Sequence, residues 1–140
     1  MHTHAPEEAD TDAALDEVVL AFDPGRNLGA AWVRRDGTAV RLAILAAADL
    51  DRLPLPRGAV VLVGDGTGSE DVVERLRARG VAPTLVDERD TTLMARGLYF
   101  RDHPSRGFLR LVPSGMRSPP RPIDDYAAYA IALRWLGVCR

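Results

Sequence analysis

The feature that most constrains the fold is a series of five short apolar runs, of which the first three are separated only by turns. Asp36-Gly37 is a strong hairpin signal, so these three runs are expected to form an antiparallel meander. Segments with apolar residues at helical spacing join the later runs, and such crossovers connect parallel strands with a right-handed turn. The expected strands cover residues 18–22, 28–33, 39–45, 59–63 and 83–86.

The segments between and after the later strands predict helices. Ser69 is the expected cap of the second helix, and Asp90 or Thr91 that of the third. The expected helices cover residues 46–53, 70–79, 91–99 and 124–136, with a proline-rich loop over 101–122 before the last. The order is that of the ribonuclease H-like fold, an α/β mixed five-stranded sheet with helices on both faces. Its first strand is central, beside the fourth.

The chain length of 140 residues suits a single domain. We expect the domain to span residues 17–140, because residues 1–16 are acidic and small and predict a disordered tail. The beginning of the chain lacks the features of a secretory signal. No apolar run approaches the roughly 18–20 residues of a membrane span. A cytoplasmic protein without a membrane partner is expected.

The basic residues narrow the function classes. All 18 are arginine, which excludes mechanisms that need a P-loop or Schiff-base lysine. Cys139 is the one cysteine, so the chain has neither an internal disulfide nor a zinc motif. Residues 96–121 interleave arginines with aromatic side chains, a composition that binds phosphates and stacks on bases. These candidate nucleic-acid contacts are Arg96, Arg101, Arg106, Arg110, Arg117 and Arg121.

Acidic residues follow the carboxyl ends of the expected parallel strands or open the last helix, where function gathers in such sheets. Each also has a local explanation as a turn, a loop acid or a helix cap. Converging carboxylates repel one another unless a cation lies between them, and their hard oxygens suit Mg²⁺ or Mn²⁺. The candidate ligands are Asp23, Asp65, Glu88, Asp124 and Asp125.

Three stretches of the chain carry a family resemblance. Residues 20–25 (Leu-Ala-Phe-Asp-Pro-Gly), followed by the apolar run 28–33, resemble the opening of the RuvC and YqgF families. Residues 86–96 are similar to the YqgF signature Asp-Glu-Arg-x-[Ser/Thr]-Thr-x-x-Ala, the most specific match. Residues 124–130 resemble the closing helix of those families. A weaker similarity lies in the glycine-rich stretch after the fourth strand.

The resemblance implies a metal-dependent nuclease with a ribonuclease H-like fold. Members of these families resolve Holliday junctions or mature the 5′ end of pre-16S rRNA, so the implied partner is a DNA junction or a structured RNA. The family's catalytic acids fall on Asp23, Glu88 and either Asp124, by the YqgF register, or Asp125, by the RuvC register. Asp65 lies where RuvC carries an additional acid, and Arg89 is expected to contact phosphate. RuvC-like proteins often pair, so a homodimer is compatible with the resemblance.

The chain departs from the family at Asp90, which replaces the usual leucine, and in the long loop over residues 101–122. These departures leave a second reading open, a non-catalytic nucleic-acid-binding or regulatory protein of the same fold. A third reading is a phosphotransferase of the actin and sugar-kinase type. Those proteins close two such domains over ATP, whereas this chain has one.

Overall fold

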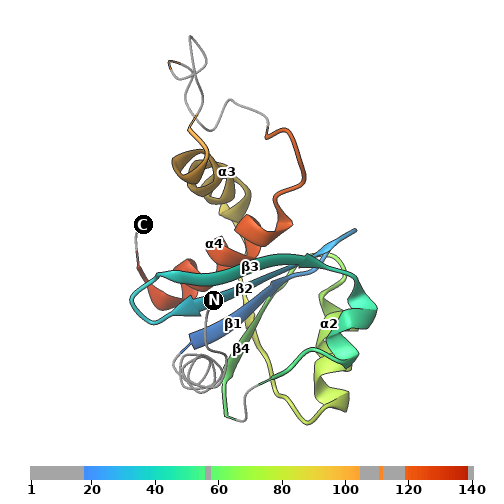
Figure 1. The fold of residues 1–140 in the computed structure, drawn as a ribbon. Helices are drawn as coiled ribbons and strands as arrows, with labels where there is room; N and C mark the ends of the chain where they lie inside the picture. Colours follow the sequence, from blue (N-terminus) through green and yellow to red (C-terminus); the bar gives the residue numbers. More distant parts are fainter. Residues whose placement is uncertain (1–17, 56–57, 105–110, 112–118, 139–140) are drawn as a thin grey trace, which may run out of the picture.

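Figure 1 shows the computed structural model of the chain, which describes residues 18–55, 58–104, 111 and 119–138. In chain order its elements are β1 (Val18–Asp23), β2 (Leu28–Arg34), β3 (Ala39–Leu45), the 3-10 helix η1 (Ala47–Asp51), β4 (Val60–Gly64), α2 (Ser69–Ala78), β5 (Thr84–Val86), α3 (Thr91–Asp102) and α4 (Asp124–Leu136). None of the helices in this described part combines the length and the apolar character needed to cross a membrane. The predicted tail over residues 1–16 lies outside the described residues.

The five strands form one mixed sheet in the order β3-β2-β1-β4-β5. β2 pairs antiparallel with both β1 and β3, whereas β4 pairs parallel with both β1 and β5. The expected α/β class is therefore confirmed, together with the central first strand beside the fourth. Because β1, β4 and β5 run in one direction, their carboxyl ends share one edge of the sheet.

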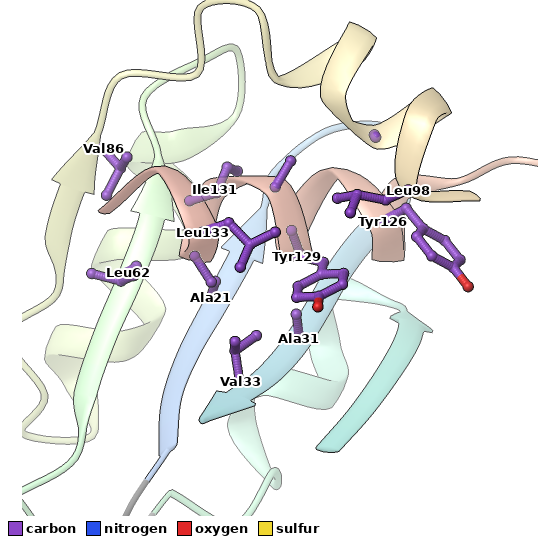
Figure 2. Packing of buried hydrophobic residues seen from close by; sticks show 14 of the residues in the cluster. Ala21, Ala31, Val33, Leu62, Val86, Leu98, Tyr126, Tyr129, Ile131 and Leu133 are labelled. Carbon is purple, nitrogen blue, oxygen red and sulfur yellow. The ribbon is translucent and has the colours of Figure 1, made fainter. Parts of the chain in front are cut away.

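Both faces of the sheet are covered by helices, as predicted. Val19 and Ala21 of β1 face the core beneath α3 and α4, and Figure 2 shows the α4 side chains packed over this face. Leu20 and Phe22, at the alternate positions of β1, belong to a second core that includes Leu50 of η1 and Leu76 of α2. The strand reads as a continuous apolar run because both of its faces are buried.

Helix α4 lies close to the sheet. Its buried face carries Ala128 and Ala132, whose small side chains let the helix approach the strands. At its first turn the contact is closer still, since a Cβ built on Gly29 of β2 would overlap the backbone of Asp124. Glycine at position 29 thus allows the amino end of α4 to rest directly on β2.

Several predicted boundaries shift by a few residues. β5 begins at Thr84 rather than Pro83, consistent with the missing N–H of proline. The expected helix over 46–53 is the shorter 3-10 helix η1, and Ser69 lies inside α2 rather than capping it, because Gly68 occupies the cap position. α3 continues to Asp102, three residues beyond the expected end, since Leu98 and Tyr99 are buried among core residues of α4.

Tyr129 ties α4 to the hairpin between β2 and β3. Its buried hydroxyl donates a hydrogen bond to the carbonyl oxygen of Gly37 at 2.6 Å. We expect Tyr129→Phe to lower the free energy of unfolding by about 1–3 kcal/mol in urea titrations, because a buried acceptor loses its donor. Tyr126→Phe is the matched control with a smaller expected loss, since its hydroxyl donates to a carboxylate of Asp102 that is 38% exposed. Equal losses in the two variants would contradict this account.

Candidate functional site

Asp23 is the last residue of the central strand β1. It pairs with Gly29 of β2, and the preceding residue Phe22 pairs with Val63 of β4. Its side chain is half-buried at the carboxyl edge of the sheet. Because β1 lies between β2 and β4 in the sheet, Asp23 has neighbours on both sides.

Glu88 reaches the same edge from the loop after β5. The amide of Asp65, directly after β4, donates to the carbonyl oxygen of Val86 at 3.0 Å. The Asp65 carboxylate in turn accepts a hydrogen bond from the amide of Glu88 at 3.3 Å. A Cβ built on Gly66 would overlap the Glu88 carboxylate, so the absence of a side chain at position 66 provides the space that Glu88 occupies.

Asp124 is the first residue of α4, and the close contact of its backbone with Gly29 places it at the same sheet edge. Because Gly29 pairs with Asp23, the contact brings the two aspartates together. Asn27, in the turn between β1 and β2, directs its amide nitrogen toward the Asp124 carboxylate at 3.5 Å. Asp23, Glu88 and Asp124 therefore meet from three separate parts of the chain, and we refer to them as the acidic site.

The electrostatics of Asp23 reflect this crowding. Burial, followed by the negative charges of Glu88 and Asp124, raises the pKa of Asp23 from an ordinary value of 3.8 to about 7. A hydrogen bond between the Asp23 and Glu88 side chains contributes in the same direction. Near neutral pH the Asp23 carboxyl therefore retains its proton for part of the time, unless a cation lies beside it.

The acidic site is not arranged as a complete metal cage. Across the residues that the structure describes, no group of three or more His, Cys, Asp or Glu side chains has a geometry ready to hold a metal ion. The donor chemistry nevertheless suits a hard divalent cation, since the site consists of carboxylate oxygens that repel one another. The side chains would have to change rotamer to bring three of them onto one ion.

Asp125, the other candidate at the start of α4, is engaged elsewhere. It is 7% exposed, and both of its carboxylate oxygens accept hydrogen bonds from the Arg121 guanidinium at 3.3 Å. It does not contribute to the pKa shift of Asp23, whereas Asp124 does. The geometry therefore favours Asp124 over Asp125 as the acid of this site. Asp65 accepts a hydrogen bond from the backbone amide of Glu88 and, like Asp125, does not contribute to the pKa shift of Asp23.

The described arginines that were predicted to bind phosphate differ in their local partners. Arg89 is largely exposed and lies 3.5 Å from Asp87, whereas Arg101 pairs with Asp102 at 3.0 Å. Arg96 lies on α3, and Arg121 is the partner of Asp125. Arg106, Arg110 and Arg117 lie outside the described residues, so their predicted role remains a prediction.

Sequence reasoning missed three contributors to the site, namely Asn27, Gly29 and Gly66. Gly29 and Gly66 were visible only as members of motifs, and their function here is to leave space for Asp124 and Glu88. Asn27 had no signal beyond its position four residues after Asp23. The departure at Asp90 has a local explanation, because Asp90 adopts a φ of 66°, and aspartate tolerates this left-handed region better than leucine does.

Comparisons with known proteins do not assign the chain to a class, so the class has to be inferred from the fold and the site. No protein-family model matches the chain, and no curated protein is significantly similar to it.

Proposed function

We propose that the protein is a divalent-metal-dependent endonuclease that hydrolyses phosphodiester bonds in structured nucleic acid. The observation that carries the proposal is the meeting of Asp23, Glu88 and Asp124 at the carboxyl edge of the sheet, with the pKa of Asp23 raised to about 7. Carboxylates that converge in this way are the usual holders of the ions that assist phosphodiester hydrolysis.

The topology supports assignment to the ribonuclease H-like class. The order β3-β2-β1-β4-β5, with β2 antiparallel to its neighbours, is the arrangement expected for that class. The three acids also occupy the positions of the RuvC-like and YqgF-like motifs at residues 20–25, 86–96 and 124–130. The agreement between motif positions and spatial position is stronger support than either alone, because the motifs are far apart in the chain.

Mg²⁺ or Mn²⁺ would be held by Asp23, Glu88 and Asp124. When bound, such an ion supplies Lewis acidity and activates a water molecule toward phosphorus. Asn27 orients the Asp124 carboxylate, and Asp65 fixes the backbone of Glu88. Without the ion, the raised pKa of Asp23 keeps its carboxyl partly protonated near neutral pH, so occupation of the site would release that proton.

A specific observation also favours the second reading, a non-catalytic nucleic-acid-binding protein. In the described part of the chain, the acids do not form a ready three-ligand cage. Under that reading the acids stabilise the fold locally, and nucleic acid binds without turnover. The two readings differ in one measurable property, which is metal-dependent cleavage.

The deciding experiment is a cleavage assay with Mg²⁺, Mn²⁺ or EDTA. The wild-type protein would be given a labelled four-way DNA junction and, separately, a labelled 5′ pre-rRNA leader. Cleavage that requires the metal supports the nuclease, and the preferred substrate distinguishes DNA from RNA. Salt-sensitive binding without cleavage of either substrate would favour the non-catalytic reading.

The same assay distinguishes the two aspartates of α4. We expect Asp124→Asn to lower the cleavage rate by at least about 100-fold, because a charged ligand is lost. Asp125→Asn should lower the rate by less than about tenfold while reducing the free energy of unfolding by about 1 kcal/mol, because its pair with Arg121 is weakened. The reverse pattern would transfer the role in the acidic site to Asp125.

A further inference from the structure

An aromatic stack lies where the end of α3 meets the start of α4. The ring of His103, directly after α3, stacks on Tyr99 with 4.3 Å between ring centroids and 14° between planes. Tyr126 of α4 meets both rings edge-on, at centroid distances of 5.5 Å from Tyr99 and 6.1 Å from His103. We refer to Tyr99, His103 and Tyr126 as the ring stack.

The His103 ring lies at the exposed end of the stack. The Tyr126 ring meets the stack edge-on and does not stack on a face of the His103 ring. His103 is exposed, whereas Tyr99 and Tyr126 are buried. The stack therefore ends in an exposed imidazole with one face covered by Tyr99, and we refer to its other face as the outer face.

The orientation of the imidazole is fixed. Its Nδ1 lies 3.0 Å from the carbonyl oxygen of Tyr99, which holds the ring in the plane of the stack. The backbone amide of His103 already donates to the same carbonyl at 2.8 Å, so closing the helix end does not require the side chain. Capping of the α3 carboxyl end therefore does not account for a histidine side chain at this position.

A cationic side chain lies against two rings of the stack. The Arg121 guanidinium lies 5.3 Å from the Tyr99 ring and 5.9 Å from the Tyr126 ring. The Arg121 side chain is 41% exposed, and Arg101, whose partner Asp102 also accepts a hydrogen bond from Tyr126, is 42% exposed. An exposed flat ring with partly exposed arginines nearby is an arrangement that can receive a base on the ring and its phosphates on the cations.

The stack is also close to the acidic site along α4. Tyr126 follows Asp124 by two residues, which corresponds to about 3 Å along the helix axis, on the opposite side of the helix. Figure 1 shows α3 and the start of α4 on the same side of the sheet. A strand of nucleic acid passing the amino end of α4 could contact both.

We propose that the outer face of His103 is a stacking position for an unpaired base of the bound nucleic acid. This inference rests on the proposed function and specifies it, because it makes nucleic acid with an unstacked nucleotide, rather than uniform duplex, the preferred ligand. Stacking requires a π face and not a particular base, so the position is tolerant of sequence.

The test uses the full chain in EDTA, so that binding is measured without cleavage. The probes are a fluorescently labelled oligothymidine and an oligomer of the same length with abasic sites in place of the bases. We expect His103→Ala to weaken binding of the oligothymidine by about tenfold to 100-fold, and binding of the abasic strand by less than about twofold. His103→Phe, which keeps a flat ring, should restore most of the loss, and the salt dependence should be the same in all three proteins.

Each alternative outcome has a distinct meaning. If the wild-type protein binds both probes equally and with strong salt dependence, the stacking position is wrong while nucleic-acid binding stands. If His103→Ala weakens both probes by the same factor, or His103→Phe fails to restore binding, the imidazole does not stack on a base. If the wild-type protein binds neither these probes nor the junction and the rRNA leader, the proposed function fails and the stacking position with it.

Discussion

Asp23→Asn is expected to produce a protein that is more stable than the wild type above neutral pH and has lost cleavage. The wild-type carboxyl has its pKa raised to about 7 by burial and by Glu88 and Asp124. Ionising it in the folded protein is therefore costly, and an amide of the same shape avoids that cost. Few substitutions in the chain combine a gain in stability with loss of activity, so the pair of effects is diagnostic of a functional site.

The pH range over which the stability changes follows from the direction of the pKa shift of Asp23. Between the ordinary pKa of 3.8 and the raised value of about 7, the folded protein binds more protons at Asp23 than the unfolded chain does. The stability contributed by this residue is therefore highest at low pH and falls as the pH rises through that window. We expect nearly equal stabilities near about pH 4, and an advantage of up to about 4 kcal/mol for Asp23→Asn at about pH 8 in EDTA.

Denaturant titrations across this pH range check the prediction, with Asp71→Asn as a control. Asp71 is a surface acid of α2 paired with Arg75, so the same neutralisation there should give no stability advantage at high pH. Addition of Mn²⁺ should stabilise the wild-type protein at about pH 8 and leave Asp23→Asn unchanged, because binding to the folded state alone raises stability. Retained cleavage in Asp23→Asn, or lower stability than the wild type at about pH 8, would remove Asp23 from the proposed site.

The strand order was predictable because local signals were consistent with each other. Asp36-Gly37 specified a hairpin, and the helical spacing of Val72 and Leu76 specified a crossover. The two-sided burial of β1 was visible as an uninterrupted apolar run. Boundaries were harder to place, because the length of α3 depends on the packing of Leu98 and Tyr99 against α4, which no local pattern contains.

The acidic site was predictable only to the level of the sheet edge. Placing Asp23 and Glu88 together required the strand order alone, whereas the choice between Asp124 and Asp125 depended on the rotation of α4. That rotation depends on the contact of the helix with Gly29 and on the pairing of Asp125 with Arg121, which are tertiary contacts. The spaces at Gly29 and Gly66 could not be recognised from the sequence, because a glycine in a loop or strand has several common explanations.

Gly66→Ala is expected to disable the acidic site while leaving the fold intact. The added methyl group would overlap the carboxylate of Glu88, which is the far end of a flexible side chain and can swing away. Gly66 does not need a positive φ, so alanine introduces no backbone strain. We therefore expect the free energy of unfolding to change by less than about 1 kcal/mol and the cleavage rate to fall by at least about 100-fold.

Gly25→Ala is the matched control for this substitution. Gly25 lies in the turn after Asp23, and a Cβ there would meet the carbonyl oxygen of Asn27 at an ordinary 3.5 Å. A methyl group at position 25 should leave cleavage within about twofold of the wild type, because it displaces nothing. Displacing Glu88 also removes a negative neighbour from Asp23, so Gly66→Ala should lower the pKa of Asp23 toward its ordinary value, and NMR titration of that carboxyl can follow the change. If Gly66→Ala cleaved as fast as Gly25→Ala while this pKa fell, Glu88 would be an electrostatic neighbour of the site rather than one of its ligands.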